Sequence, residues 1–288
     1  MALWNGERAP FTVLGGYLGA GKTTIVNHIV ASAGGRRIVV LVNDIAAVNV
    51  DSALIADHDG ITLSLTNGCV CCAIADDFGQ TLEQIRAMPE PPDHVLMELS
   101  GVGEPARVAP WASTAGFRLD GIVIVADADQ IVELSRREYV GDTIGAQLTA
   151  ADLVLLTKTD LAADGGAAAR ALVVRHAPAP IIEVRRGVVD VDVVLGVDRS
   201  DVGLSSATRR VGSYETAVVD IGSPTLAELE RLLADLPANV IRAKGLIRCA
   251  DVEVPVEAHV VGSRRTVRHR PDLDASDASD VLVLIRCE

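Results

Sequence analysis

Three of the chain's five cysteines lie within four positions, Cys69, Cys71 and Cys72, in the segment NGCVCC. This segment follows the strand-like run ITLSL and begins with Asn and Gly, so its three thiols can turn towards one point. Three thiolates suit a soft or borderline ion such as Zn²⁺ or Cu⁺, with a fourth ligand supplied from elsewhere. A redox-active cysteine pair and buried, unreactive thiols are the alternatives. The spacing favours the metal site.

A second motif, GYLGAGKT, fits the pattern G-x-x-x-x-G-K-[ST], which holds phosphates. It follows the strand-like run FTVL and opens the helix-like segment TTIVNHIVASA, which is the context that the motif requires. Its glycines let backbone N–H groups face a phosphate, and the helix N-terminus adds a positive dipole end. We expect Lys22 to reach the β- and γ-phosphates and Thr23 to offer its hydroxyl to Mg²⁺. The residues expected to contact nucleotide here are Gly16, Gly19, Ala20, Gly21, Lys22, Thr23 and Thr24.

Two acidic residues follow apolar runs and are candidates for the chemistry at the phosphates. Glu98, in HVLMELSG, is the expected acid that holds Mg²⁺ or its water. Asp44 ends the run IVVLVND and either belongs to a switch that senses the γ-phosphate or caps a helix. Lys22, Asp44 and Glu98 are therefore the predicted catalytic residues.

The run LLTKTD predicts a base pocket. An Asp at the end of a strand can accept hydrogen bonds from N1–H and the 2-amino group of guanine, and adenine does not present this pair of donors. We expect Asp160 to read guanine, the stem of Lys158 to cover the purine, and Thr157 to lie beside them. Together with the phosphate motif, this favours GTP and GDP over adenine nucleotides.

Composition limits the partners and the compartment. The formal net charge is −13 at pH 7, which disfavours nucleic acid and anionic membrane as partners. The N-terminus lacks the features of a secretory signal, and eighteen consecutive apolar residues do not occur. We therefore expect a cytoplasmic protein, where an odd number of cysteines indicates metal or redox chemistry rather than structural disulfides.

The order of apolar runs predicts the fold. Between residues 11 and 184, Val- and Ile-rich runs without polar alternation are separated by helix-like segments, as in an α/β domain with a mainly parallel sheet flanked by helices. The polar segment 198–213 is the expected linker. Residues 1–197 then form the P-loop domain, and residues 214–288, with strand-like runs and one amphipathic helix, form a smaller α+β domain.

The motifs GGYLGAGKTT, VND, NGCVCC, ELSGVGEP, VADAD, TKTD and RAKG occur in the order seen in the CobW-type metal-trafficking GTPases. The chain resembles this family over nearly its whole length. The resemblance implies a GTP-hydrolysing metallochaperone or metal-insertion factor with a client metalloprotein, a CobW C-terminal domain that helps to choose the client, and a possible homodimer. By position, it assigns the metal motif to Cys69, Cys71 and Cys72, with zinc as the expected ion and cobalt as the alternative.

Two departures from the family pattern bear on this interpretation. Where relatives often have NEFGE, this chain has Asn43, Asp44, Ile45, Ala46 and Ala47, so a switch glutamate is missing and the fourth metal ligand is open. Thr157 replaces the usual asparagine of the guanine motif, which predicts loss of a tie between the base loop and the phosphate loop.

Three functions remain to be separated. The first is a GTPase whose turnover serves metal delivery. The second is a nucleotide-gated zinc store or sensor with little turnover, for which Thr157 would mark a decayed pocket. The third is a redox-responsive ATPase, which predicts adenine preference and a titratable disulfide at the cysteine cluster.

Overall fold

The computed structural model describes residues 8–43, 61–65, 75–196, 209–211, 214–262, 264–271, 273, 278 and 280–287. The chain divides into two compact units, Met1–Leu195 and Gly196–Glu288. The first is α/β and the second is a smaller α+β unit, so the fold class predicted from the sequence is confirmed. The predicted boundaries at residues 197 and 214 stay predictions.

Among the described residues, the first unit has a seven-stranded sheet in the order β3-β2-β4-β1-β5-β6-β7. Every neighbouring pair is parallel. The strands are β1 (Pro10–Gly15), β2 (Ile38–Asn43), β3 (Ile61–Leu65), β4 (His94–Glu98), β5 (Arg118–Asp127), β6 (Leu153–Thr157) and β7 (Ile181–Val184). Strands β4 and β6 are buried along their full length, which explains their lack of polar alternation. Because the strands are parallel, their carboxyl ends all lie at one edge.

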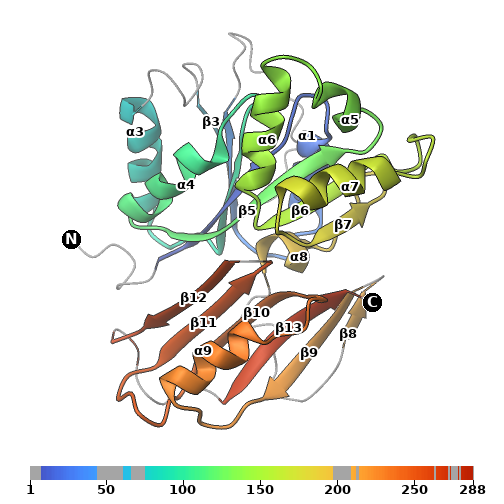
Figure 1. Cartoon of the computed structure of the whole chain (residues 1–288). Helices are drawn as coiled ribbons and strands as arrows, with labels where there is room; N and C mark the ends of the chain where they lie inside the picture. Colours follow the sequence, from blue (N-terminus) through green and yellow to red (C-terminus); the bar gives the residue numbers. More distant parts are fainter. Residues whose placement is uncertain are drawn as a thin grey trace. The chain divides into compact units, whose positions relative to one another are not determined.

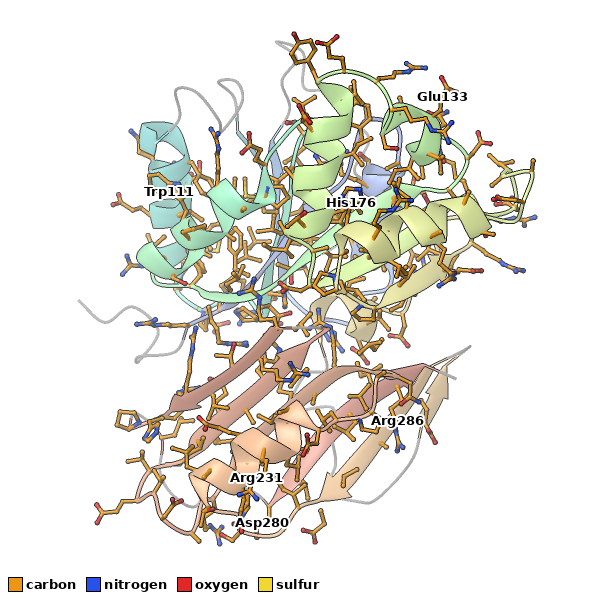
Figure 2. The ribbon with its side chains drawn as sticks, in the orientation of Figure 1. Trp111, Glu133, His176, Arg231, Asp280 and Arg286 are labelled. Carbon is orange, nitrogen blue, oxygen red and sulfur yellow. The ribbon has the colours of Figure 1, made fainter. Side chains whose placement is uncertain are left out.

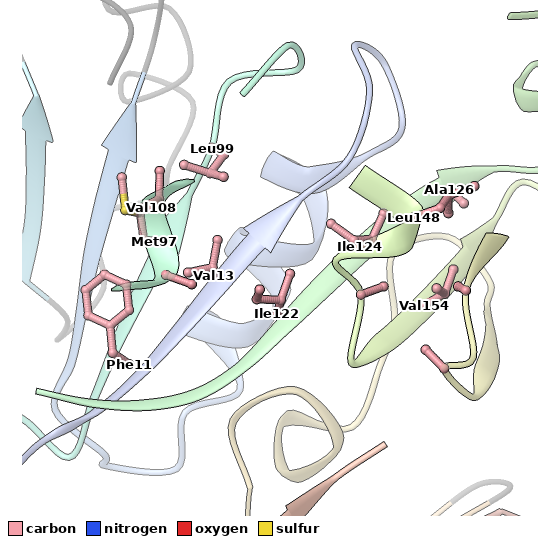
Figure 3. Close-up of a cluster of buried hydrophobic side chains, with 14 of the residues drawn as sticks. Phe11, Val13, Met97, Leu99, Val108, Ile122, Ile124, Ala126, Leu148 and Val154 are labelled. Atoms are coloured by element: carbon pink, nitrogen blue, oxygen red, sulfur yellow. The ribbon is translucent and has the colours of Figure 1, made fainter. Parts of the chain in front are cut away.

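Helices cover both faces of this sheet (Figure 1). They are α1 (Lys22–Ala31), α3 (Ala75–Arg86), α4 (Pro105–Thr114), α5 (Ile131–Leu134), α6 (Val140–Thr149), α7 (Ala167–His176) and α8 (Val191–Leu195). The close-up in Figure 3 shows Phe11 and Val13 of β1 beside Met97 of β4 and Val108 of α4, all buried in one apolar cluster. Burial of each such side chain contributes about 1.5–3 kcal/mol, so this core fixes the strand ends that carry the polar residues.

An aromatic pair joins two of these helices. The ring of Trp111 on α4, labelled in Figure 2, meets Phe78 of α3 edge-on, with ring centroids 6.1 Å apart. Such pairs add about 0.5–1.5 kcal/mol to the burial of the rings. Phe78 is fully buried, so the pair connects the α3–α4 layer to the core.

The second unit is an antiparallel sheet with one described helix. The strand order is β12-β11-β10-β13-β9-β8. The elements are β8 (Arg209–Val211), β9 (Tyr214–Asp220), α9 (Leu226–Ala234), β10 (Val240–Ile247), β11 (Val256–Val261), β12 (Arg264–His269) and β13 (Val281–Cys287). Helix α9 begins with a capping box between Thr225 and Glu228, and its leucines pack on one face of the sheet. The backbone N–H of Thr225 holds the pKa of Glu228 below its usual range.

Two strands of this unit differ from the sequence-based expectation. Residues 209–211 lie in the segment predicted as a linker, but they form β8 and pair with β9. Strand β12 was not predicted because it is rich in arginine and lacks an apolar alternation. It lies at the edge of the sheet beside β11, where charged side chains are tolerated and discourage pairing with other chains.

Candidate functional site

The phosphate motif forms the loop between β1 and α1. At Gly16 the backbone φ is 135°, and a Cβ atom there would lie 2.3 Å from the carbonyl oxygen of Val125, so only glycine fits. The loop ends at Gly21, the N-cap of α1, where no side chain caps the helix and no acidic residue occupies the first turn. The first backbone N–H groups of α1 therefore remain available for an anion such as a phosphate.

Lys22 lies under this loop. Its ammonium donates to the carbonyl oxygens of Gly16 at 3.0 Å and Tyr17 at 3.4 Å, and the residue is 8% exposed. These bonds hold a positive charge inside the loop, where phosphate oxygens of a nucleotide would face it. Thr24, the third residue of α1, is exposed.

Glu98 and Thr23 meet at the carboxyl edge of the sheet. Strand β4 lies beside β1 in parallel register, with Glu98 opposite Leu14, so the acid ends next to the phosphate loop. The hydroxyl of Thr23 donates to Oε1 of Glu98 at 2.8 Å, and Glu98 is 2% exposed. A hydroxyl and a carboxylate are hard oxygen donors, so these two residues fit Mg²⁺.

Thr157 ties the base loop to the phosphate loop. Its Oγ1 lies 2.9 Å from the carbonyl oxygen of Ala20 and 3.2 Å from that of Ala126, and its shorter hydrogen bond is to Ala20. The prediction that threonine at this position removes the tie is therefore wrong. A hydroxyl reaches the phosphate loop because Thr157 ends β6 and is buried against it.

The next residues of the predicted base pocket are also at this edge. Lys158 has a positive φ of 56°, and its ammonium donates to the carbonyl of Gly19 at 2.8 Å and to the carboxylate of Asp127 at 2.7 Å. Asp160 lies in the following turn and is exposed. Farther along the same turn, backbone N–H groups of Ala168 and Gly166 hold the pKa of Asp164 below its usual range.

A loop behind the phosphate site is held by a glutamine that the sequence analysis did not single out. Nε2 of Gln147, on α6, donates to the carbonyl oxygens of Gly101 at 3.1 Å and Gly103 at 2.9 Å. Gln147 is 1% exposed. The loop follows Glu98, and a Cβ at Gly101 would come within 2.6 Å of the backbone nitrogen of Leu18, so it packs directly on the phosphate loop. The sequence signal that could have identified this residue is that Gln147 is a single polar side chain on the apolar side of the run GAQLTAADL.

Asp44 and the cysteines Cys69, Cys71 and Cys72 lie outside the described residues, and so does Ala47. The strands that lead to them are described. Strand β2 ends at Asn43 opposite Leu65, the last residue of β3, and Val42 of β2 lies opposite Glu98. Both segments therefore begin at the edge of the sheet that carries Glu98.

The described part of the chain has no group of three or more His, Cys, Asp or Glu side chains that could hold a metal ion. Cys249 is a free cysteine and is buried, and burial raises the pKa of its thiol. None of the described helices is long and apolar enough to cross a membrane.

Comparison with known proteins gives matches over both units. Residues 10–180 match the family model described as CobW/HypB/UreG, nucleotide-binding domain, and residues 217–287 match the cobalamin synthesis protein cobW C-terminal domain. The zinc chaperone CobW of Sinorhizobium sp is 29% identical over 293 residues, covering 86% of this chain and 80% of that protein. The zinc-regulated GTPase metalloprotein activator 1 of Schizosaccharomyces pombe is 33% identical over 166 residues, covering 54% of this chain and 40% of that protein. The crystal structure of Zn(II)-bound YjiA GTPase from Escherichia coli is 20% identical, with a TM-score of 0.48, and the match covers 98% of this chain and 95% of that one.

Proposed function

The chain belongs to the CobW/HypB/UreG family, and from that membership we propose that it is a GTP-hydrolysing zinc metallochaperone. In this proposal, zinc binds to Cys69, Cys71 and Cys72, and GTP hydrolysis governs its transfer to a client metalloprotein. The observation that carries the proposal is the 2.8 Å contact of Thr23 with Glu98 beside the phosphate loop. The names of the relatives, zinc chaperones and a zinc-regulated GTPase, support zinc as the ion.

In this proposal, each residue around the nucleotide site has a role. The loop amides and Lys22 bind the β- and γ-phosphates, Thr157 and Lys158 hold the base loop against the phosphate loop, and Asp160 reads guanine. Thr23 and Glu98 would hold Mg²⁺, which neutralises charge that develops on the phosphates during hydrolysis. Asp44 would belong to the switch that responds to the γ-phosphate.

The strand order supports coupling between nucleotide and metal. Strand β2 lies between β3 and β4, so the segment that begins after Asn43 starts between Leu65 and Glu98. The cysteine segment begins at Asn67, two residues after Leu65. A change at the γ-phosphate can therefore reach the metal ligands through neighbouring strand ends, without a path through the core.

The test is zinc affinity measured by chelator competition in the presence of GDP or a non-hydrolysable GTP analogue. We expect zinc to bind at least fivefold more tightly in the GTP state, since hydrolysis is proposed to release it. The variant with Cys69, Cys71 and Cys72 changed to serine should lose tight binding. Cys249→Ala, which changes a buried thiol outside the cluster, is the matched control and should bind as the unmodified chain does.

Turnover separates this proposal from the nucleotide-gated zinc store. Multiple turnovers of GTP with a rate that responds to zinc support the metallochaperone, and tight zinc binding without hydrolysis supports the store. The Thr157 bond to Ala20 favours the first function, because the store depended on a decayed base pocket. Cobalt as the ion, a homodimer and the identity of the client stay predictions.

A further inference from the structure

Asp127 is a buried carboxylate at the nucleotide site to which the proposed function gives no role. It ends β5 opposite Thr157 of β6, at the same edge of the sheet as the phosphate loop. The residue is 6% exposed. An ionised carboxylate buried to this degree needs charged or hydrogen-bonding partners, because desolvation disfavours its charge.

Both oxygens of this carboxylate have partners in the described structure. Oδ1 accepts the backbone N–H of Asp129 at 3.0 Å, which closes the turn after β5. Oδ2 accepts from the ammonium of Lys158 at 2.7 Å, and this pair is a salt bridge in which the lysine side chain is 34% exposed. Asp127 therefore holds one end of the lysine that is expected to cover the base.

Lys158 is constrained at both of its ends. Its backbone has φ of 56°, a region that non-glycine residues seldom occupy and that costs energy to maintain. Its ammonium donates to Gly19 of the phosphate loop at 2.8 Å as well as to Asp127. A lysine side chain held at its ammonium loses most of its rotamer freedom before a base arrives.

We propose that Asp127 is a positioning residue for guanine-nucleotide binding: its carboxylate holds Lys158 across the gap between β6 and the phosphate loop. This inference rests on the proposed function. Asp127 contacts neither base nor phosphate in this role and acts through Lys158 alone. The lysine stem is thereby preorganised as a flat surface for the purine, and the base loop is kept beside the phosphate loop.

The competing explanation is that Asp127 only closes its own turn through the N–H of Asp129. A double-mutant cycle on GDP affinity, measured by isothermal titration calorimetry with the full chain, separates the two. Asp127→Asn keeps the shape and the turn acceptor and removes the charge. Lys158→Met keeps an apolar stem and removes the ammonium. Asp129→Asn makes the same change in net charge at an exposed neighbour and is the matched control.

We expect Asp127→Asn to weaken GDP binding about tenfold, which corresponds to about 1.4 kcal/mol. In the Lys158→Met background the same change should weaken binding less than twofold, because the partner through which Asp127 acts is gone. A turn-closing role would instead give little or no loss in either background, because asparagine keeps the acceptor for Asp129. That result, or equal losses in both backgrounds, would overturn the proposal. Asp129→Asn should bind GDP within twofold of the unmodified chain, and a tenfold loss there would also count against it.

Three further results would also bear on this role of Asp127. If Asp127→Asn fails to fold, Lys158→Met, which removes the ammonium from both Asp127 and Gly19, should lose about tenfold in GDP affinity; unchanged affinity overturns the inference. If the unmodified chain does not prefer GDP to ADP, the proposed function fails and this inference with it. If the chain binds GDP and Asp127→Asn binds equally well, only the positioning role of Asp127 is lost.

Discussion

Replacing Thr157 by valine tests whether one hydroxyl joins the base loop to the phosphate loop. Valine has nearly the same volume, so no cavity forms, but the hydrogen bond to the carbonyl of Ala20 is lost. Ala20 is 2% exposed, which leaves its carbonyl with little access to water. An unsatisfied buried acceptor costs about 1–3 kcal/mol, and we expect Thr157→Val to destabilise the first unit by about 1–2 kcal/mol.

The assay can be confined to the unit that carries the change. Both tryptophans of the chain, Trp4 and Trp111, precede residue 195, so tryptophan fluorescence during urea unfolding reports on the first unit. GDP affinity should fall about fivefold in the same variant, because the base loop and the phosphate loop that bind the nucleotide are no longer joined. Thr157→Ser keeps the hydroxyl and should retain the affinity within twofold. If Thr157→Val matches the unmodified chain in both stability and GDP affinity, the hydroxyl of Thr157 does not join the base loop to the phosphate loop.

Three other predictions follow from side chains described above. Gln147→Leu removes two buried hydrogen bonds to the loop after Glu98 and should cost about 2–3 kcal/mol in urea unfolding; a loss below about 0.5 kcal/mol would contradict this. Cys249, whose thiol pKa is raised by burial, should resist alkylation in the folded chain at neutral pH and react after unfolding, as mass spectrometry of its peptide would show. Asp164 has a pKa below its unfolded value, so its stabilising effect is present at neutral pH and lost as pH falls through the folded pKa. Asp164→Ala should therefore be less stable than the unmodified chain at pH 7, and the gap in Tm should close on acidification below about pH 4.

Local patterns were sufficient to predict the elements that form the site. The phosphate loop needs glycine where its backbone approaches Val125, and the acid strand needs an apolar run because both of its faces are buried. Each of these requirements can be recognised in a few consecutive residues of the sequence. The parallel register then places Glu98 beside the loop without further information.

Contacts between distant residues could not be predicted in the same way. Asp127 and Lys158 are 31 residues apart, and Gln147 is 44 and 46 residues from the two carbonyls that it holds. Asp127 and Lys158 meet because the sheet order puts β5 beside β6, and Gln147 meets its two carbonyls because α6 packs against the loop after β4; sequence spacing alone predicts neither contact. Thr157 shows the same limit, since a family pattern predicts a lost amide but not that a hydroxyl lies close enough to replace it.

The strand order bears on the proposed coupling between nucleotide and metal. Leu65 and Glu98 lie two strands apart, which places their backbones about 10 Å from each other at the ordinary spacing of a sheet. The segment after Asn43 begins between these two strand ends, and the proposed coupling would act through it. Because such coupling is reciprocal, zinc must raise the affinity for the GTP analogue by the same factor as the analogue raises the affinity for zinc. Unequal factors would mean that one of the two ligands binds at a second place in the chain.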